Sequence, residues 1–361
     1  MIHRLVLENL KHRPVQTLLS AAFIGVQVTI LLTLVGVSRG VLGDMAKRSK
    51  GTGADIFIRP PDSALLGFSG EMPEKVVEIV RDQPHVAQAT GALVHSISTF
   101  DTITGIHADE FNAMSGGLRY LKGDVFHDRD DLVVDEVYAK AHDLRPGSMV
   151  ELGHLWRVTG IVESGKLSRT FTDIRALQDL FSAHDKVSVV YVKLDDPANT
   201  KQAIASLKQR LDDFKIYSAE EFMALFSVDN VPILKGFTRV VIALAIIGGF
   251  LVVFLAMYMT VLERTREIGI LKALGASPGY ILSILMRETV ILTAGGTIAG
   301  ILMTYGTREL MRIFVPTMPQ MIVPDWYGWA AIIAMTGSII GAIYPGLRAA
   351  RQDAIEALAY D

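Results

Sequence analysis

The chain has 361 residues, of which half are hydrophobic and 20% are charged. A soluble protein of this length usually carries more charge, and the mean hydropathy is +0.35. The formal net charge of −3 gives no support to nucleic-acid binding, and the lack of cysteine excludes disulfides, thiolate metal sites and cysteine nucleophiles.

The N-terminal region predicts a membrane anchor. Residues 1–14 are basic and are interpreted as a cytosolic amphipathic leader, and residues 15–41 form an apolar run long enough to be transmembrane helix 1. A cleaved signal peptide is the alternative. An uncleaved anchor is favoured because the run exceeds the usual apolar core of a signal peptide, about 7–15 residues, and no convincing small-residue cleavage site follows it.

Residues 44–230 have an ordinary globular composition and predict an extracytoplasmic domain. Because strands and helices alternate there without a clean repeat, we expect an α+β fold. The predicted strands are Ala54–Ile58, Leu132–Val134, Val150–Leu152, Arg157–Val162 and Val187–Leu194. The predicted helices are Pro73–Arg81, Glu136–His142, Arg175–Phe181 and Thr200–Phe214.

Two features of this domain resemble ligand sites. Residues 160–167 nearly match the phosphate-binding loop, but Leu167 stands where a Ser or Thr would bind magnesium, so we interpret the segment as a strand end and a turn. His107 and Asp109 are close in sequence, but the nine histidines are dispersed. A polar surface turn explains the pair better than a metal site.

Three more apolar runs follow the outer domain. Residues 236–262, 281–310 and 326–345 are predicted to be transmembrane helices 2, 3 and 4, and residues 346–361 a cytosolic tail. Trp326 and the aromatic residues beside it suit an interfacial belt. The expected fold class is therefore a membrane all-α four-helix transmembrane region with an inserted α+β extracytoplasmic domain.

Lys and Arg in the short flanking segments predict the orientation. They lie in the leader, in the segment after helix 2 and in the tail, whereas residues 314–325 contain none. With four crossings, the three basic segments fall on one side of the membrane. We therefore expect a multi-pass protein of the cell inner (cytoplasmic) membrane, with both termini cytosolic and residues 44–230 outside.

The segment directly after helix 2, residues 263–279, is the most informative in the chain. Ile268, Leu271 and Leu274 recur every three residues, and Glu263 and Glu267 would share a helical face. From spacing alone, an ordinary juxtamembrane helix and a helix that docks a partner remain equally open. The candidate coupling residues are Glu263, Arg264, Arg266, Glu267, Ile268, Leu271, Lys272 and Leu274.

The end of that segment also matches a catalytic pattern. Residues 275–279 read G-x-S-x-G, but a nucleophile elbow needs a strand-to-helix turn, and this segment lies between two membrane helices. Pro278 is better interpreted as the start of a helix. We therefore predict no catalytic, cofactor-binding or metal-binding residue on this chain.

Pairs of glycines in the membrane segments have the G-x-x-x-G spacing that lets helices approach closely. Routine packing inside one bundle explains most such pairs, and contact between two copies of the chain is the alternative. The candidate packing residues are Gly36, Gly40, Gly296, Gly300, Gly337 and Gly341.

Residues 263–277 and the tail segment 344–358 resemble the MacB/FtsX-like permease family, also called type VII ABC transporters. Residues 133–136 and 156–162 of the outer domain, and the leader motif Leu-x-x-x-Asn-Leu-Lys-His-Arg, are similar to that family as well. The outer domain is closer in size to the DevC-like or haem-exporter-like branch than to the macrolide-efflux members.

The resemblance implies a non-catalytic permease that pairs with a second copy or a paralogue. Two cytosolic ABC ATPase subunits, which would hold ATP and magnesium, are expected to dock on the helix around residues 263–274. ATP-driven closure would then move the outer domains, a mechanotransmission through the membrane helices. Membrane lipids and a periplasmic adaptor protein are further expected partners.

Two functions follow from the resemblance. The first is export or extraction of an amphiphilic substrate, and the alternative is transmembrane signalling that controls an extracytoplasmic partner such as a cell-wall hydrolase. A membrane enzyme is disfavoured because no catalytic motif is found in its required context.

Overall fold

The computed structural model describes residues 14–63, 70–97, 102–226 and 232–351. The chain divides into two compact units. We call Met1–Ser38, Ile233–Arg312 and Gln320–Asp361 the membrane unit, and Arg39–Pro232 with Ile313–Pro319 the sheet unit. The predicted leader, except Pro14, and residues 352–361 of the predicted tail lie outside the described residues.

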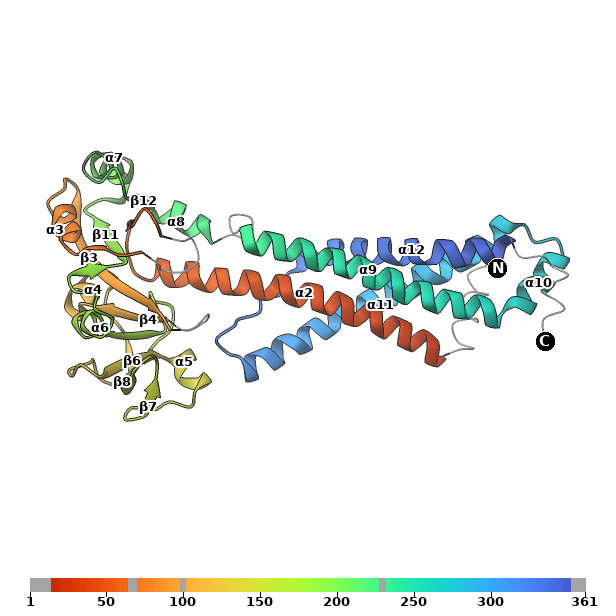
Figure 1. The fold of residues 1–361 in the computed structure, drawn as a ribbon, viewed down its shortest axis with the longest axis horizontal. Helices are drawn as coiled ribbons and strands as arrows, with labels where there is room; N and C mark the ends of the chain where they lie inside the picture. The colour runs from red at the N-terminus through yellow and green to blue at the C-terminus, as the bar shows by residue number, and fades with distance from the viewer. Residues whose placement is uncertain (1–13, 64–69, 98–101, 227–231, 352–361) are drawn as a thin grey trace. The chain divides into compact units, whose positions relative to one another are not determined.

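Within the described residues, four helices are long and apolar enough to cross a membrane. They are α2 (Pro14–Lys50), α9 (Pro232–Glu263), α11 (Pro278–Phe314) and α12 (Tyr327–Arg351) (Figure 1). Side chains exposed along α9 are almost all aliphatic or aromatic, as expected where lipid replaces water. The membrane all-α part of the predicted fold class is therefore confirmed.

The helices extend beyond the predicted spans. The second helix, α9, stops at Glu263, and a separate helix, α10 (Thr265–Ala273), follows after a break at Arg264. The last helix, α12, continues through Pro345 to Arg351. A proline inside a helix removes one backbone hydrogen bond, which a membrane helix tolerates when neighbouring groups compensate.

The sheet unit is built on one ten-stranded mixed sheet of the described residues. Its strand order is β12-β1-β11-β3-β4-β9-β6-β8-β5, with β7 paired to β8. The β4–β9 and β6–β8 pairs are parallel, and the other neighbours are antiparallel. The strands are β1 (Ile56–Arg59), β3 (Val86–Ser96), β4 (Thr102–Ile106), β5 (Tyr120–Gly123), β6 (Asp131–Asp135), β7 (Met149–Glu151), β8 (Leu155–Val162), β9 (Thr170–Asp173), β11 (Val189–Leu194) and β12 (Lys215–Ser218). A two-stranded sheet pairs β2 (Met72–Pro73) with β10 (Lys186–Val187).

Helices cover both faces of this sheet. On one face pack α3 (Lys75–Arg81), α5 (Glu136–Ala141), α6 (Ile174–Leu180) and α7 (Thr200–Arg210). On the other pack α4 (Ala108–Ser115) and α8 (Ala219–Leu225). Central strands are consequently buried on both sides, and alternate residues enter different cores. Leu132 and Val134 of β6 belong to one core and Val133 to the other.

The α+β class predicted for residues 44–230 is confirmed, and the domain is a single unit with one main sheet. The predicted strands Val150–Leu152 and Arg157–Val162 correspond to β7 and β8, which pair antiparallel as a hairpin. Helix α7 ends at Arg210, four residues before the predicted end, because the chain turns there into β12.

Candidate functional site

Helix α10 lies between two membrane helices and has a defined start and stop. Arg264 separates it from α9, and Gly275, with φ of +91°, ends it in the left-handed conformation that glycine adopts without strain. Pro278 then opens α11, and Ser277 Oγ accepts a hydrogen bond from Tyr280 N–H at 3.2 Å. The G-x-S-x-G match is thus a helix stop followed by a capped helix start.

The side chains of α10 divide into an inner and an outer side. Ile268 is buried and Leu271 half-buried, but Leu274 is 80% exposed. Of the apolar residues Ile268, Leu271 and Leu274, which recur every three positions, the last consequently lies on the exposed side of the helix. Each step of three residues falls about 60° short of a full helical turn, so this series of residues drifts off the packed side.

The outer side of α10 combines charge with exposed aliphatic groups. We call Glu263, Arg266, Glu267, Ile270 and Leu274 the α10 face, because all five are exposed. Ile270, which the sequence analysis did not select, is 47% exposed. The signal for it was available, since Arg266, Ile270 and Leu274 follow one another at four-residue steps along the same face of a helix. An exposed mixture of aliphatic and charged groups is suited to docking a protein.

Arg264 does not belong to this face, although it was predicted among the coupling residues. Its side chain is only 12% exposed, and its Nε donates to Glu267 Oε2 at 2.8 Å. Its Nη1 lies 3.6 Å from Oε2 of Glu288, a buried residue of α11. Arg264 thus joins the end of α9 to both α10 and α11, and its position fits holding α10 in place better than binding a partner.

Lys272 is half-buried, at the other end of α10. Of the eight predicted coupling residues, the structure consequently leaves four on the outer side and turns the rest partly or fully inward. The outward set is Glu263, Arg266, Glu267 and Leu274, and the inward set is Arg264, Ile268, Leu271 and Lys272.

Four of the predicted glycines lie where helices of the same chain touch. A Cβ on Gly300 would come within 2.5 Å of the Gly25 carbonyl of α2, and one on Gly296 within 2.9 Å of the Ala21 carbonyl. Gly337 and Gly341 of α12 meet the backbone of α9 in the same way. Gly36 packs against the Met321 carbonyl and Gly40 is buried. Packing within one chain accounts for the contacts of these glycines.

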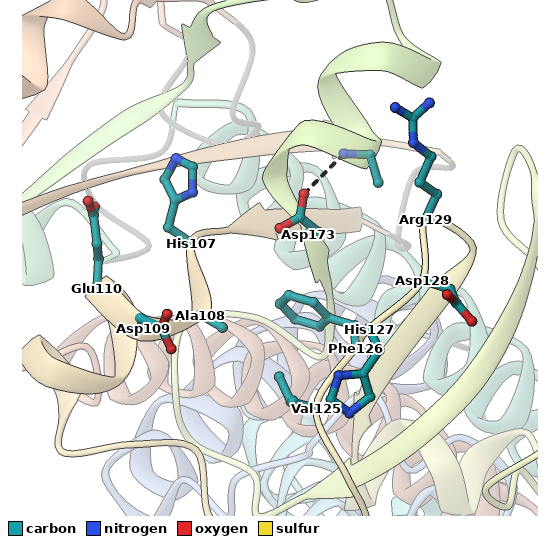
Figure 2. Close-up of a pocket in the computed structure, with 11 residues that line it drawn as sticks. His107, Ala108, Asp109, Glu110, Val125, Phe126, His127, Asp128, Arg129 and Asp173 are labelled. Carbon is teal, nitrogen blue, oxygen red and sulfur yellow. Dashed lines mark hydrogen bonds between the residues drawn. The ribbon is translucent and has the colours of Figure 1, made fainter.

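The sheet unit contains a polar pocket of about 500 Å³ (Figure 2). It is lined by His107, Ala108, Asp109, Glu110, Val125, Phe126, His127, Asp128, Arg129, Asp173 and Ala176. Glu110 pairs with Arg81 at 2.6 Å, and Asp128 pairs with Arg157 at 2.7 Å. Asp173 accepts hydrogen bonds from the first N–H groups of α6.

These contacts neutralise most of the pocket's carboxylates or use them to stabilise helix ends. His107 and Asp109, which we interpreted as a polar surface turn, both line the pocket, and His107 Nε2 lies 2.9 Å from Glu74 Oε1. No group of three or more His, Asp or Glu within the described residues is arranged to hold a metal ion.

The segment that resembles a phosphate-binding loop has a structural use. Strand β8 ends at Val162 and a turn follows, in which Gly165 has φ of +108°. Lys166 Nζ donates to the carbonyl of Ser115 at 2.7 Å and to that of Gly117. The lysine therefore satisfies carbonyl groups at the end of α4, where no N–H of the helix can reach them.

Comparison with known families accounts for most of the chain. The MacB-like periplasmic core domain family matches residues 17–210, and the FtsX-like permease C-terminal family matches residues 239–354. The uncharacterized ABC transporter permease YknZ of Bacillus subtilis is 26% identical over 97% of this chain and 96% of its own length.

The macrolide export ATP-binding/permease protein MacB of Escherichia coli is 24% identical over 99% of this chain. The chain spans 60% of the length of that relative. Among solved structures, the periplasmic region of MacB from Actinobacillus actinomycetemcomitans is 18% identical, covers 50% of this chain and 96% of that chain, and has a TM-score of 0.38.

Proposed function

This chain belongs to the MacB/FtsX family of ABC transporter permeases, and on that premise we propose that it couples ATP hydrolysis by a cytosolic ATPase to movement of its sheet unit outside the cytosol. It is a multi-pass inner-membrane protein, and permeases of this family work with cytosolic ABC ATPases. The observation that carries the proposal is the α10 face, which presents Ile270 and Leu274 between charged groups at the end of a membrane helix.

The topology follows from the basic segments. Lys and Arg are concentrated in the leader, in the segment after helix 2 and in the tail. Because such residues stay on the cytosolic side, the α10 face and both termini are cytosolic and the sheet unit is periplasmic. A tag inserted at Gly70 should be labelled from outside in intact cells. A tag that is labelled only after the membrane is opened would overturn the topology and the proposed function with it.

We place ATP and magnesium on a separate ATPase subunit. YknZ, a permease by name, matches this chain over nearly its whole length, whereas the MacB relatives combine ATP-binding and permease functions in one longer chain. Lys166, the lysine of the segment that resembles a phosphate-binding loop, is committed to carbonyl groups of the sheet unit, which supports the same division.

Within the α10 face, the two aliphatic side chains would supply the buried centre of the ATPase contact and the charged ones its rim. Arg264 would hold α10 against α11, so that a push on α10 reaches the membrane helices. Pairing with a second permease copy or a paralogue would place two such helices on two ATPase subunits.

The test is co-purification from membranes of the native host with the ABC ATPase subunit. The Ile270→Asp, Leu274→Asp double variant should lose the ATPase, because a carboxylate in a contact that excludes water is costly. The matched control is Ile79→Asp, which places the same charge on an exposed aliphatic position of the sheet unit. Full retention of the ATPase by the double variant would contradict the docking role.

For the work done outside, we propose export or extraction of an amphiphilic substrate, assisted by membrane lipids and by a periplasmic adaptor. The match of residues 17–210 to the MacB-like periplasmic core domain supports this choice over control of a cell-wall hydrolase. Stimulation of ATP hydrolysis by an amphiphile in the reconstituted complex would support export. Stimulation by a purified hydrolase alone would support signalling instead.

A further inference from the structure

Four charged side chains of the sheet unit meet where α2 ends, and we call them the outer charge cluster. They are Asp44, Arg48, Asp135 and Arg169. Arg169 Nη2 donates to Asp44 Oδ2 at 2.8 Å, and its Nη1 lies 3.4 Å from Asp135 Oδ2. Arg48 Nε lies 3.2 Å from the same Asp44 oxygen. The charges of the two anionic and two cationic groups therefore cancel.

Arg169 is held by its backbone as well as by its side chain. Its carbonyl accepts a hydrogen bond from Asp135 N–H at 2.7 Å, which fixes it beside the end of β6. Its Nη2 also donates to the carbonyl of Thr317 at 3.3 Å. One guanidinium thus contacts three stretches that are far apart in sequence. They are the end of α2, the end of β6, and residues 313–319, which comprise the last two residues of α11 and the chain that follows them.

The turn before Arg169 encloses the end of α2. Leu167 N–H donates to the Arg48 carbonyl at 2.9 Å, which satisfies one of the carbonyl groups left open at a helix C-terminus. Gly51, directly after the helix, lies against the backbone of Gly165, where no side chain would fit. The segment that resembles a phosphate-binding loop therefore also caps the C-terminus of α2 and packs against it.

Asp135 and Arg169 are shielded from water, whereas Asp44 is partly exposed. Asp135 is 1% exposed and the Arg169 side chain 14%. Burial raises the pKa of Asp135 above its usual value, against the opposing effects of the Tyr138 N–H, Arg169 and Arg48. Loss of the Arg169 guanidinium would raise that pKa further. Buried charges of this kind add little net stability, but they accept few alternative geometries, so they define how the parts around them are arranged.

We propose that Arg169 is a positioning residue that locks the end of α2 and residues 313–319 to the sheet. Without it, a displacement of α2 would be absorbed by bending where the helix ends. With it, the displacement is passed to β6 and β9 of the sheet. This inference rests on the proposed function, in which the sheet unit moves when the ATPase closes.

The test uses the full chain, purified with its ATPase and placed in lipid nanodiscs. The first variant is Asp44→Asn, which breaks the link to α2 and leaves the Arg169–Asp135 pair in place. The second is Arg169→Met, and Arg169→Lys is the conservative variant that keeps the charge but not the fork of donors. Asp143→Asn and Arg145→Met, at exposed positions of the same unit, are the matched controls.

Amide hydrogen exchange is measured without nucleotide and after trapping with ATP and vanadate. Without nucleotide, exchange in residues 44–50 and 313–319 should become about tenfold faster in Asp44→Asn and Arg169→Met, with β1 and β11 unchanged. The trapped state should alter exchange in β6 and β9 of the wild type and the controls. That response should be lost in both variants and partly kept in Arg169→Lys, while ATPase co-purification stays normal.

A nucleotide response of β6 and β9 that survives in Asp44→Asn and Arg169→Met would overturn the inference. So would faster exchange throughout the sheet in Asp44→Asn, because the residue would then support the whole fold. If the wild type shows no nucleotide response, the proposed function fails, and the measurement without nucleotide still decides the lock.

Discussion

The membrane unit and the sheet unit satisfy their buried polar groups in different ways. In α11, the hydroxyls of Thr289, Thr293 and Thr304 each donate to the carbonyl four residues earlier in the same helix. In the sheet unit, Arg157 reaches Asp131 across 26 residues of sequence, and Arg169 reaches Asp44 across 125.

The solvent explains the difference. A helix that enters lipid has no water to bond its polar groups, so each helix must satisfy its own before it packs. A domain that folds in water can keep charges solvated until distant strands meet. Contacts between helices in the membrane unit consequently include close backbone approach at glycines, alongside side-chain links such as that from Thr29 Oγ1 to the Gly300 carbonyl. Contacts between segments of the sheet unit depend on cores and ion pairs.

The largest loss of stability is expected from placing a side chain at the glycine contact between α11 and α2 in the membrane unit. Gly300→Leu should destabilise the chain by about 3 kcal/mol, because its side chain would meet the Gly25 carbonyl and Val28 of α2. Gly306→Leu on the same helix has open space around it and should have little effect. Thermal unfolding of the purified variants in detergent compares the two, and equal losses would refute the proximity argument.

An intermediate loss of stability is expected at a buried carboxylate of the sheet unit, Asp131. Asp131 accepts hydrogen bonds from the N–H groups of His127 and Asp128 and from Arg157. Asp131→Asn should cost about 2 kcal/mol at neutral pH, because these donors serve a charged acceptor. Asp130→Asn, an exposed neighbour paired with His154, should cost far less. The free energy of unfolding of the two variants checks this.

The same carboxylate predicts a pH dependence. Burial alone would raise the pKa of Asp131, but the Asp128 and His127 N–H groups and Arg157 outweigh it and hold the pKa below the usual 3.8. The stabilisation by the ionised group is thus complete above the unfolded pKa and lost as the pH falls through the lower, folded value. The difference in the free energy of unfolding between wild type and Asp131→Asn should therefore narrow below pH 3.8. A difference that stays constant with pH would contradict this prediction.

The smallest losses of stability are expected at two fully buried threonines, one in each unit. Thr172 of β9 donates to the Asp131 carbonyl, 41 residues away, at 2.9 Å. Thr172→Val should cost about 1.5 kcal/mol, whereas Thr293→Val in α11 should cost about 0.5 kcal/mol or less, because the accepting carbonyl is already engaged in its helix. If denaturation of the two variants gave the reverse order, the distinction between local and long-range satisfaction would be wrong.

Much of the membrane unit could be predicted because its signals are local. A run of about 20 apolar residues identifies a span whatever its neighbours are, and glycine spacing marks a close helix face. In the sheet unit, β3 was missed, since Val86–Ser96 contains glycine and small residues and shows no alternation. Its place between β11 and β4 in the sheet comes from partners distant in sequence.

Within the candidate site, the sequence by itself determined that a short helix with charged and aliphatic residues follows the second span. Only the tertiary structure decided that Arg264 turns inward to Glu288, that Ile270 and Leu274 face out, and that Arg169 joins α2 to the sheet. The reason is physical. Periodicity records which residues share a face of one element, but the direction of that face and the partners of a charge depend on elements that only folding brings together.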